Sequence, residues 1–173
     1  MTTTTRLSEL NGDYVLDTGR TRIGFVARHR MATRVRGRFD LFEGAVHLDG
    51  DEPSRSSAQL TIRAESLETG NERRDAQLRR DFLGAATYPI ITFVSTKVEQ
   101  VGSTTFDVTG DLTIRGVTHP VTVPFELTGT DDGVAFAATV TIERARWRVN
   151  WNAFTTALVG PTVVLDLQVV ATA

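Results

Sequence analysis

The chain has 173 residues, of which 40% are hydrophobic and 23% charged, so it can form one domain with its own core and is neither disordered nor collagen-like. The absence of cysteine excludes a disulfide scaffold, a zinc–thiolate site and a thiol nucleophile. The net charge of -2 is too small to draw the protein as a whole to nucleic acid. Seven arginines nevertheless fall between residues 20 and 38 with no acidic residue among them, which predicts one cationic strand region.

The first residues are polar and include a run of four threonines, so we expect a flexible tail over residues 1–12, followed by a single domain over residues 13–173. This start has no apolar stretch that could serve as a secretion signal. No apolar run in the chain approaches the roughly 18 residues that a bilayer-spanning helix requires. We therefore expect a cytoplasmic protein without stable membrane insertion.

From residue 21 onwards, hydrophobic and polar residues alternate in a way that is typical of antiparallel strands with one wet face. Threonine (26 residues) and valine (19) are abundant, and branching at the β-carbon suits both to strands. In residues 104–115, for example, Phe106, Val108 and Leu112 share one face. The alternation predicts eight strands, near residues 21–31, 35–48, 57–65, 90–99, 104–115, 118–128, 134–148 and 162–172.

The alternation changes phase within two of these strands. Hydrophobic positions in the second strand are odd-numbered as far as Leu41 and even-numbered from Phe42, which predicts a β-bulge near Glu43–Gly44. A similar change predicts a second bulge near Glu143–Arg144. Bulges of this kind bend long strands around a barrel.

Residues 66–89 interrupt the strand rhythm and contain good helix formers. Candidate caps precede the segment at Thr69, Gly70 and Asn71, so we predict one short helix at about residues 71–82. Its few large apolar side chains suit a lid or plug at one end of a barrel better than a core helix. Further along the chain, Asp132–Gly133 has the sequence of a tight hairpin turn.

Eight long strands with polar outer faces favour an all-β fold in which an antiparallel, up-and-down barrel closes, because closure removes exposed edges. A sandwich of two sheets is the alternative. The interior of such a barrel is either filled by side chains or wide enough for one slender ligand. Small residues such as Ala27, Ala58 and Gly110 lie among phenylalanines on the inner face, which is compatible with either arrangement. If a lumen exists, its lining predicts a lipid-like ligand held by burial.

Motifs of the common enzyme classes are absent from the sequence. It has no G-x-S-x-G, G-x-G-x-x-G or H-E-x-x-H motif and no Walker loop. The histidines, His29, His47 and His119, lack the spacing of metal ligands, so we expect neither a metal nor another cofactor. His29 lies on an apolar face, where a hydrogen-bonded buried histidine is favoured over a contact with a ligand head group. No aromatic residues alternate with the arginines as a nucleic-acid surface requires, so we expect no nucleic-acid partner.

Five segments within residues 14–173 resemble one known family. They are YVLDTGRTRIGFVARH, GRFDLFEG, RRDAQLRRDFLGAATYPIITFVST, VTGDLTIRGVTHPVTVPFEL and IERARW. The chain is similar in these segments to the YceI-like family of bacterial polyisoprenoid-binding proteins. The resemblance implies a lipocalin-like, eight-stranded barrel around a long apolar tunnel for an isoprenoid or fatty-acyl chain, with no established enzymatic activity. The family often has His at the position of Gln77 and Gly at the position of Arg148.

We therefore predict a non-enzymatic carrier or reservoir for a long-chain amphipathic lipid, such as a polyisoprenoid quinone precursor or a prenyl phosphate. The predicted ligand-binding residues are Phe25, His29, Phe39, Leu60, Ile62, Phe93, Phe106, Phe136, Arg144 and Trp147. Two alternatives stay open. One is an isomerase or cyclase that uses His29 and a tunnel carboxylate, and the other is a packed barrel that binds proteins through the arginine-rich face. A homodimer is compatible with all three.

Overall fold

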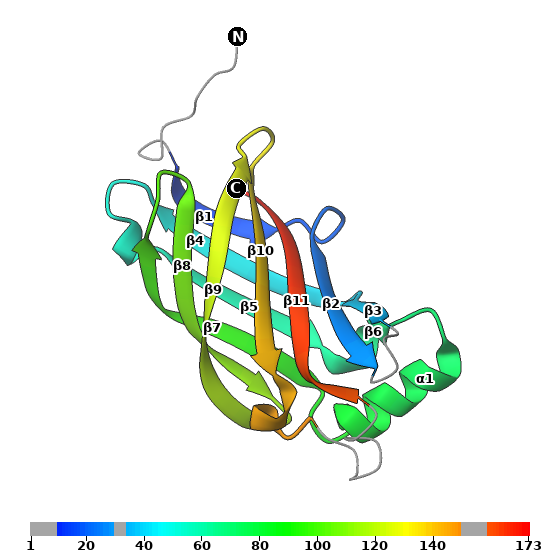
Figure 1. Ribbon diagram of the computed structural model, residues 1–173. Coiled ribbons are helices and arrows are strands. Elements are labelled where there is room, and N and C mark those ends of the chain that lie inside the picture. Colours follow the sequence, from blue (N-terminus) through cyan, green and yellow to red (C-terminus); the bar gives the residue numbers. More distant parts are fainter. Residues whose placement is uncertain (1–9, 30–33, 150–158) are drawn as a thin grey trace.

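A computed structural model describes residues 10–29, 34–149 and 159–173, which form one antiparallel sheet that closes on itself (Figure 1). Its strands are β1 (Asn11–Leu16), β2 (Arg22–His29), β3 (Arg34–Phe39), β4 (Phe42–Asp49), β5 (Ser57–Arg63), β6 (Leu67–Glu68), β7 (Ile90–Gln100), β8 (Thr105–Ile114), β9 (Val117–Gly129), β10 (Val134–Glu143) and β11 (Val159–Thr172). The helical segments are η2 (Pro53–Arg55), η3 (Ala64–Ser66), α1 (Glu72–Gln77), η4 (Leu78–Phe82) and η5 (Arg144–Trp147).

The sheet closes through β11, which pairs with β10 on one side. On its other side, β11 pairs with β2 and then, at Ala171 and Thr172, with β1. Since β1 pairs with β4 and β2 with β3, β1–β2 form one interrupted strand and β3–β4 another. With each interrupted strand taken as one unit and the two-residue β6 set aside, eight units follow one another around the barrel in chain order. The predicted eight-stranded antiparallel up-and-down barrel is confirmed.

Both predicted bulges are wrong, because the strands end where the pattern changes phase. The first change falls between β3 and β4, where Leu41 is 56% exposed and does not face the interior. A single exposed leucine is ordinary at a protein surface, so its hydrophobicity did not report its direction. At the second position β10 ends at Glu143, and the 3-10 helix η5 redirects the chain. At the start of the barrel, β1 already begins at Asn11, within the residues expected to belong to the tail.

Two hairpin turns of the barrel show the backbone conformation that their sequences favour. The turn between β9 and β10 has positive φ angles at Asp132 (56°) and Gly133 (116°), as the Asp–Gly pair predicts. The turn between β8 and β9 has them at Arg115 (52°) and Gly116 (72°). Such turns match the twist of the paired strands and so fix the registers of β8, β9 and β10.

The predicted helix at about 71–82 consists of α1 followed by the π-helical turn η4. The Asn71 side chain caps α1 by accepting a hydrogen bond from the Arg74 backbone N–H at 3.1 Å. The helix lies at one end of the barrel, beside β3 and β6 (Figure 1). That place agrees with a lid, and it brings side chains of α1 and η4 to the interior of the barrel.

Candidate functional site

The barrel encloses a cavity of about 640 Å³, within the range of roughly 300–1,000 Å³ that is usual for small-molecule sites. Its lining extends from Asp49 and Pro53, near η2, to Arg74 and Leu78 on the helical segment at the other end (Figure 1). The inner faces of β4, β5 and β7 to β11 supply most of the wall between. The cavity thus follows the length of the barrel, which suits an elongated ligand.

The described lining is almost wholly aliphatic and aromatic. Only three of its residues are charged: Asp49, Arg74 and Arg144. Asp49 Oδ1 accepts the backbone N–H groups of Asp51 and Glu52 at 3.1 and 2.9 Å, so this carboxylate caps its own turn. Such a wall can bury an apolar chain, at about 0.8 kcal/mol per CH₂ group, but offers few groups for proton transfer.

Eight of the ten residues predicted from the sequence line this one cavity: Phe25, Phe39, Leu60, Ile62, Phe93, Phe106, Phe136 and Arg144. The phenylalanines come from different strands and meet inside the barrel. The rings of Phe25 and Phe39 lie 5.7 Å apart between centroids, and the rings of Phe106 and Phe136 pack edge to face at 6.3 Å. Period-two alternation was sufficient to place these side chains inside, because successive residues of a strand point to opposite faces.

Two glycines on the barrel wall make room for aromatic rings. A Cβ atom at Gly37 would lie 2.2 Å from Phe25 Cζ, and one at Gly110 would lie 2.5 Å from Phe93 Cζ. These rings therefore lie directly against backbone instead of extending further into the cavity. Small residues in the wall therefore pack against large neighbours, as expected for a filled interior. A cavity nevertheless remains beside them.

Of the remaining two predicted residues, Trp147 is not among the described residues that line the cavity. Trp147 is completely buried, its indole N–H donates to the Leu112 carbonyl at 2.8 Å, and its ring packs edge-on against His119. These contacts make it an anchor between η5 and the β8–β9 hairpin. His29 ends β2, where its backbone pairs with Val159, and its side chain lies outside the described part of the structure.

Arg144 is the buried charge of the cavity wall, with only 3% of its surface exposed. It follows the last residue of β10, and its Nη1 donates to the Val149 carbonyl at 2.8 Å. Burial lowers the pKa of the guanidinium, but arginine keeps its proton in proteins, so the site is positively charged. A positive charge in an apolar wall is suited to an acidic or strongly polar ligand atom.

Three residues that were not predicted as ligand-binding also line the cavity: Arg74, Gln77 and Leu78. Their spacing of three and four residues places them on one face of a helix, and this pattern could have found them. The sequence pattern could not show whether this face of the helix turns towards the cavity, because that depends on how α1 is attached to the barrel.

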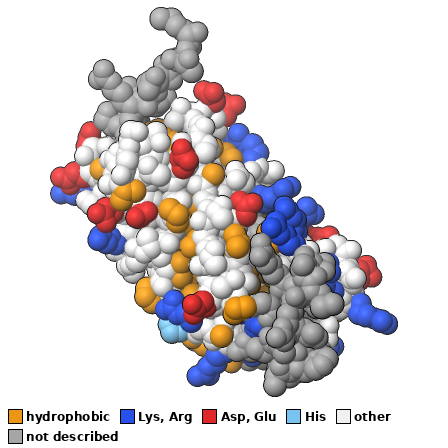
Figure 2. Space-filling model, in the orientation of Figure 1, with side chains coloured by type: hydrophobic (Ala, Val, Ile, Leu, Met, Phe, Trp, Pro, Cys, Tyr) orange, Lys and Arg blue, Asp and Glu red, His pale blue; other side chains and the backbone are white. Residues whose placement is uncertain are grey.

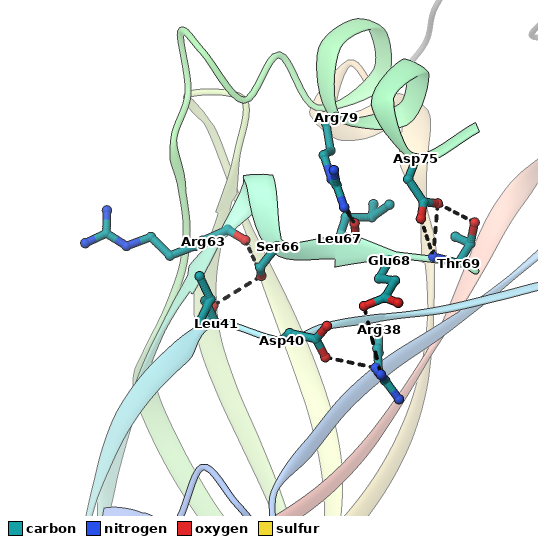
Figure 3. A network of polar contacts seen from close by, with 10 residues as sticks. All are labelled: Arg38, Asp40, Leu41, Arg63, Ser66, Leu67, Glu68, Thr69, Asp75 and Arg79. Carbon is teal, nitrogen blue, oxygen red and sulfur yellow. Dashed lines mark hydrogen bonds and ion pairs between the residues drawn. The ribbon is translucent and has the colours of Figure 1, made fainter. Parts of the chain in front are cut away.

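Polar contacts attach α1 and β6 to the barrel (Figure 3). Asp75, 97% buried, accepts the Thr69 backbone N–H with both oxygens at 3.0 Å, and it also accepts from the Thr69 hydroxyl. Arg79 donates from Nε and Nη2 to the Leu67 carbonyl at 2.9 and 2.5 Å. The helix is therefore held to β6 by its own side chains.

A second part of the network joins β6 to β3. The Arg38 guanidinium lies 2.8 Å from Asp40 and 3.9 Å from Glu68 (Figure 3). The neighbouring Asp40 carboxyl group raises the pKa of Glu68, since two carboxylates in contact disfavour full ionisation. Arg38 therefore adds a polar contact between β3 and β6.

A family model for the YceI-like domain matches residues 14–171. The chain belongs to the YceI-like family. A UPF0312 protein of Vibrio parahaemolyticus is 38% identical over 120 residues, which are 68% of this chain and 64% of the relative. Protein YceI of Escherichia coli O157:H7 is 39% identical over 111 residues, or 64% of this chain and 58% of the relative. The chain thus matches about three fifths of the length of these YceI-like relatives.

Solved structures of other proteins share the barrel. BcnA of Burkholderia cenocepacia superposes with a TM-score of 0.86 and 30% identity, covering 91% of this chain and 99% of BcnA. A polyisoprenoid-binding domain from Saccharophagus degradans, described as implicated in plant cell wall breakdown, has a TM-score of 0.77 and 22% identity, covering 92% and 98%. The second likeness is one of fold alone.

The departure from the YceI-like pattern at Arg148 has a structural meaning. Arg148 follows η5 with φ 57°, a left-handed conformation that glycine adopts without a steric penalty. The glycine that the family resemblance implies at this position would adopt this conformation without strain.

Two further findings concern other kinds of site. Among the described residues, no helix combines the length and apolar character needed to cross a bilayer. The same part of the chain has no group of three or more His, Asp or Glu side chains placed to hold a metal ion.

Proposed function

We propose that this YceI-like barrel binds a polyisoprenoid or another long-chain amphipathic lipid in its interior and acts as its carrier or reservoir. The observation that carries the proposal is the cavity of about 640 Å³, whose described lining is apolar apart from a few positions. Burial of a hydrocarbon chain against such a wall is favourable in proportion to the area removed from water. The fold shared with a polyisoprenoid-binding domain supports the same ligand class.

We place the ligand's polar head near Arg144 and its chain along the barrel towards Asp49. Arg144 and Arg74 line the cavity at the end where η5 and α1 lie, whereas Asp49 lines the opposite end (Figure 1). A phosphate or carboxylate head would be attracted to the first end and repelled from the second. A prenyl phosphate fits this polarity better than a neutral quinone precursor.

The alternatives have less support. A barrel that acts only as a packed protein-binding module requires a filled interior, which disagrees with the cavity. An isomerase or cyclase requires a tunnel carboxylate, and Asp49, the carboxylate of the described lining, is engaged in its turn. The cytoplasmic location and the homodimer stay predictions.

The first test is to fill the cavity. Val123 is 95% buried and lines it, whereas Thr122, the preceding residue, is exposed on the outer face. Val123→Trp is expected to abolish uptake of a fluorescent long-chain lipid, and Thr122→Trp to leave it unchanged. Mass spectrometry of organic extracts of both purified variants should show the bound lipid only in Thr122→Trp. Equal uptake by folded samples of both variants would refute binding in the barrel.

The second test concerns the head group. Arg144→Met keeps an unbranched, apolar stem and removes the charged guanidinium. Loss of charge-assisted hydrogen bonds is expected to weaken binding of farnesyl phosphate about tenfold to a hundredfold, with little change for farnesol. Because both ligands share one chain, farnesol is the internal control for damage to the fold. Equal weakening of the two would place the head group elsewhere.

A further inference from the structure

We propose that the protein docks onto anionic lipid surfaces with the end of the barrel that carries α1, and that its ligand passes through this end. The inference rests on the proposed lipid-binding function but adds a partner and an orientation. Three observations carry it: a separation of charge along the molecule, an exposed row of arginines on β3, and an unpaired strand edge beside α1.

Charge is distributed unevenly between the two ends of the barrel. The α1 end of the barrel is formed by residues 34–40, 63–81, 115 and 143–148. These residues include twelve arginines and seven acidic residues. The other described side chains include four basic and thirteen acidic residues. The small net charge of the whole chain therefore conceals a positive end and a negative remainder. Figure 2 shows one group of basic side chains on the side where β2 and α1 lie, and further basic side chains scattered over the rest of this face.

The arginine row is built into the strand that also forms the cavity wall. Arg34, Arg36 and Arg38 alternate along β3 with Val35, and all three arginines are exposed while Val35 lines the cavity. Arg38 is engaged with Asp40 and Glu68. Within the described part of the chain, Arg34 and Arg36 take part in no ion pair, so their charge is directed to solvent.

The third observation is an opening in the sheet at the same place. β3 pairs with β2 over its whole length, but on its other side it pairs with β6 only at Arg38 and Phe39. Residues 34–37 therefore have one edge without a partner strand among the described residues. Beyond this edge, α1 supplies Arg74 and Gln77 to the cavity lining. A ligand can pass between a helix and an unpaired edge without breaking a strand ladder.

A lipid surface with anionic head groups explains why these three features coincide. It attracts a row of arginines, and the attraction acts over about 8 Å at physiological ionic strength. The acidic remainder of the molecule is repelled, so the α1 end is oriented towards the surface. Docking in this orientation places the unpaired edge of β3 and the face of α1 where a lipid can leave the bilayer.

The experiment uses the full chain and vesicles of phosphatidylcholine, alone or with 30% phosphatidylglycerol. Co-sedimentation measures docking, and the rate at which a bound anthroyloxy fatty acid moves to quencher-containing vesicles measures transfer. We expect the anionic vesicles to increase both docking and transfer at least tenfold, and 0.5 M NaCl to remove most of the increase.

The variant Arg34→Glu/Arg36→Glu is expected to lose most of this response. Its matched control is Arg55→Glu/Lys97→Glu, which makes the same change of net charge at exposed positions (72% and 67%) away from the α1 end and should retain the response. Equal responses of the two variants, or no response of the native chain to phosphatidylglycerol, would overturn the docking proposal. Preferential binding of duplex DNA that Arg34→Glu/Arg36→Glu abolishes, without docking on vesicles, would also overturn it.

The two proposals fail in different ways. A chain that docks on anionic vesicles but takes up no fatty acid in solution supports the docking surface and contradicts lipid binding in the barrel. A chain that takes up the fatty acid but transfers it at one rate to both kinds of vesicle supports lipid binding and contradicts the docking surface.

Discussion

The two sides of this barrel are built differently. β7 to β11 form a wall of long strands. In this wall, ten consecutive residues of β10, from Val134 to Glu143, are paired with β11. On the other side, β1–β2 and β3–β4 are interrupted strands, and β6 adds only two residues. The continuous wall is also tied on its outer face by cross-strand hydroxyl contacts, such as Thr109 with Thr122 at 2.8 Å.

This difference assigns the stability of the fold to one wall and the access of the ligand to the other. Long ladders with an apolar inner face and paired side chains outside are the cooperative part of a sheet. The interrupted wall gives up part of this pairing and carries the features associated with the ligand: the helix, the arginine row and the unpaired edge of β3. Damage to the continuous wall should therefore lower global stability, whereas damage to the interrupted wall should first change ligand exchange.

The largest expected effect is that of Trp147→Ala, which removes the anchor of the continuous wall. Because Trp147 is completely buried, truncation should lower the free energy of unfolding by about 3–5 kcal/mol, as measured by urea denaturation. Trp147→Phe keeps most of the packing, and loss of the hydrogen bond to Leu112 should cost it about 1–2 kcal/mol. A loss below 1 kcal/mol for Trp147→Ala would contradict the assigned role.

Asp75→Ala tests the interrupted wall. The variant leaves the Thr69 N–H without its acceptor and should cost about 1–3 kcal/mol, mostly as local opening of α1. Hydrogen exchange should accelerate in residues 69–82 with little change in β7 to β11, and lipid should dissociate faster. Glu72→Ala, at an exposed position of the same helix, is the control. Uniform acceleration across all strands would show that the two walls open together.

Gly37 and Gly110 compare the two walls by the same substitution. At Gly37 the atoms nearest to an added methyl group all belong to the Phe25 ring, which can shift into the cavity. At Gly110 the Val94 carbonyl also lies 2.7 Å away, and backbone cannot move without disturbing the ladder. Both alanine variants should be destabilised by about 1–3 kcal/mol, Gly110→Ala the more, and Gly37→Ala should bind lipid more weakly. The reverse order in denaturation would contradict this comparison.

The smallest effect concerns pH. Because the folded pKa of Glu68 is raised, the native state holds more protons than the unfolded state between the two pKa values. The contribution of Glu68 to stability is therefore present at low pH and is lost as pH rises through the raised pKa. Glu68→Gln should show a shallower decline in unfolding free energy than the native chain as the pH rises above the usual pKa of glutamate. Identical slopes would show that Asp40 and Glu68 do not interact in solution.

The sequence was most informative where one rule decided the outcome. Alternation placed Phe93, Phe106 and Phe136 inside the barrel, and the Asp132–Gly133 pair predicted its turn. It was misleading at Leu41 and at Glu143, because a change of phase looks the same whether a strand bulges or ends. No sequence pattern predicted β1, because this strand has few hydrophobic residues and follows a polar start. Trp147 looked like cavity lining because hydrophobicity marks burial but not the neighbours of a side chain.

The amino-acid sequence by itself determined the barrel class, the inward faces of most strands and the family, since these depend on local periodicity and on residue order. The tertiary structure alone decided that the interior is partly empty and that Arg74 and Gln77 approach it from α1. Those facts depend on how eight separate strands and one helix meet across long distances in the chain. No pattern within a single segment contains that geometry.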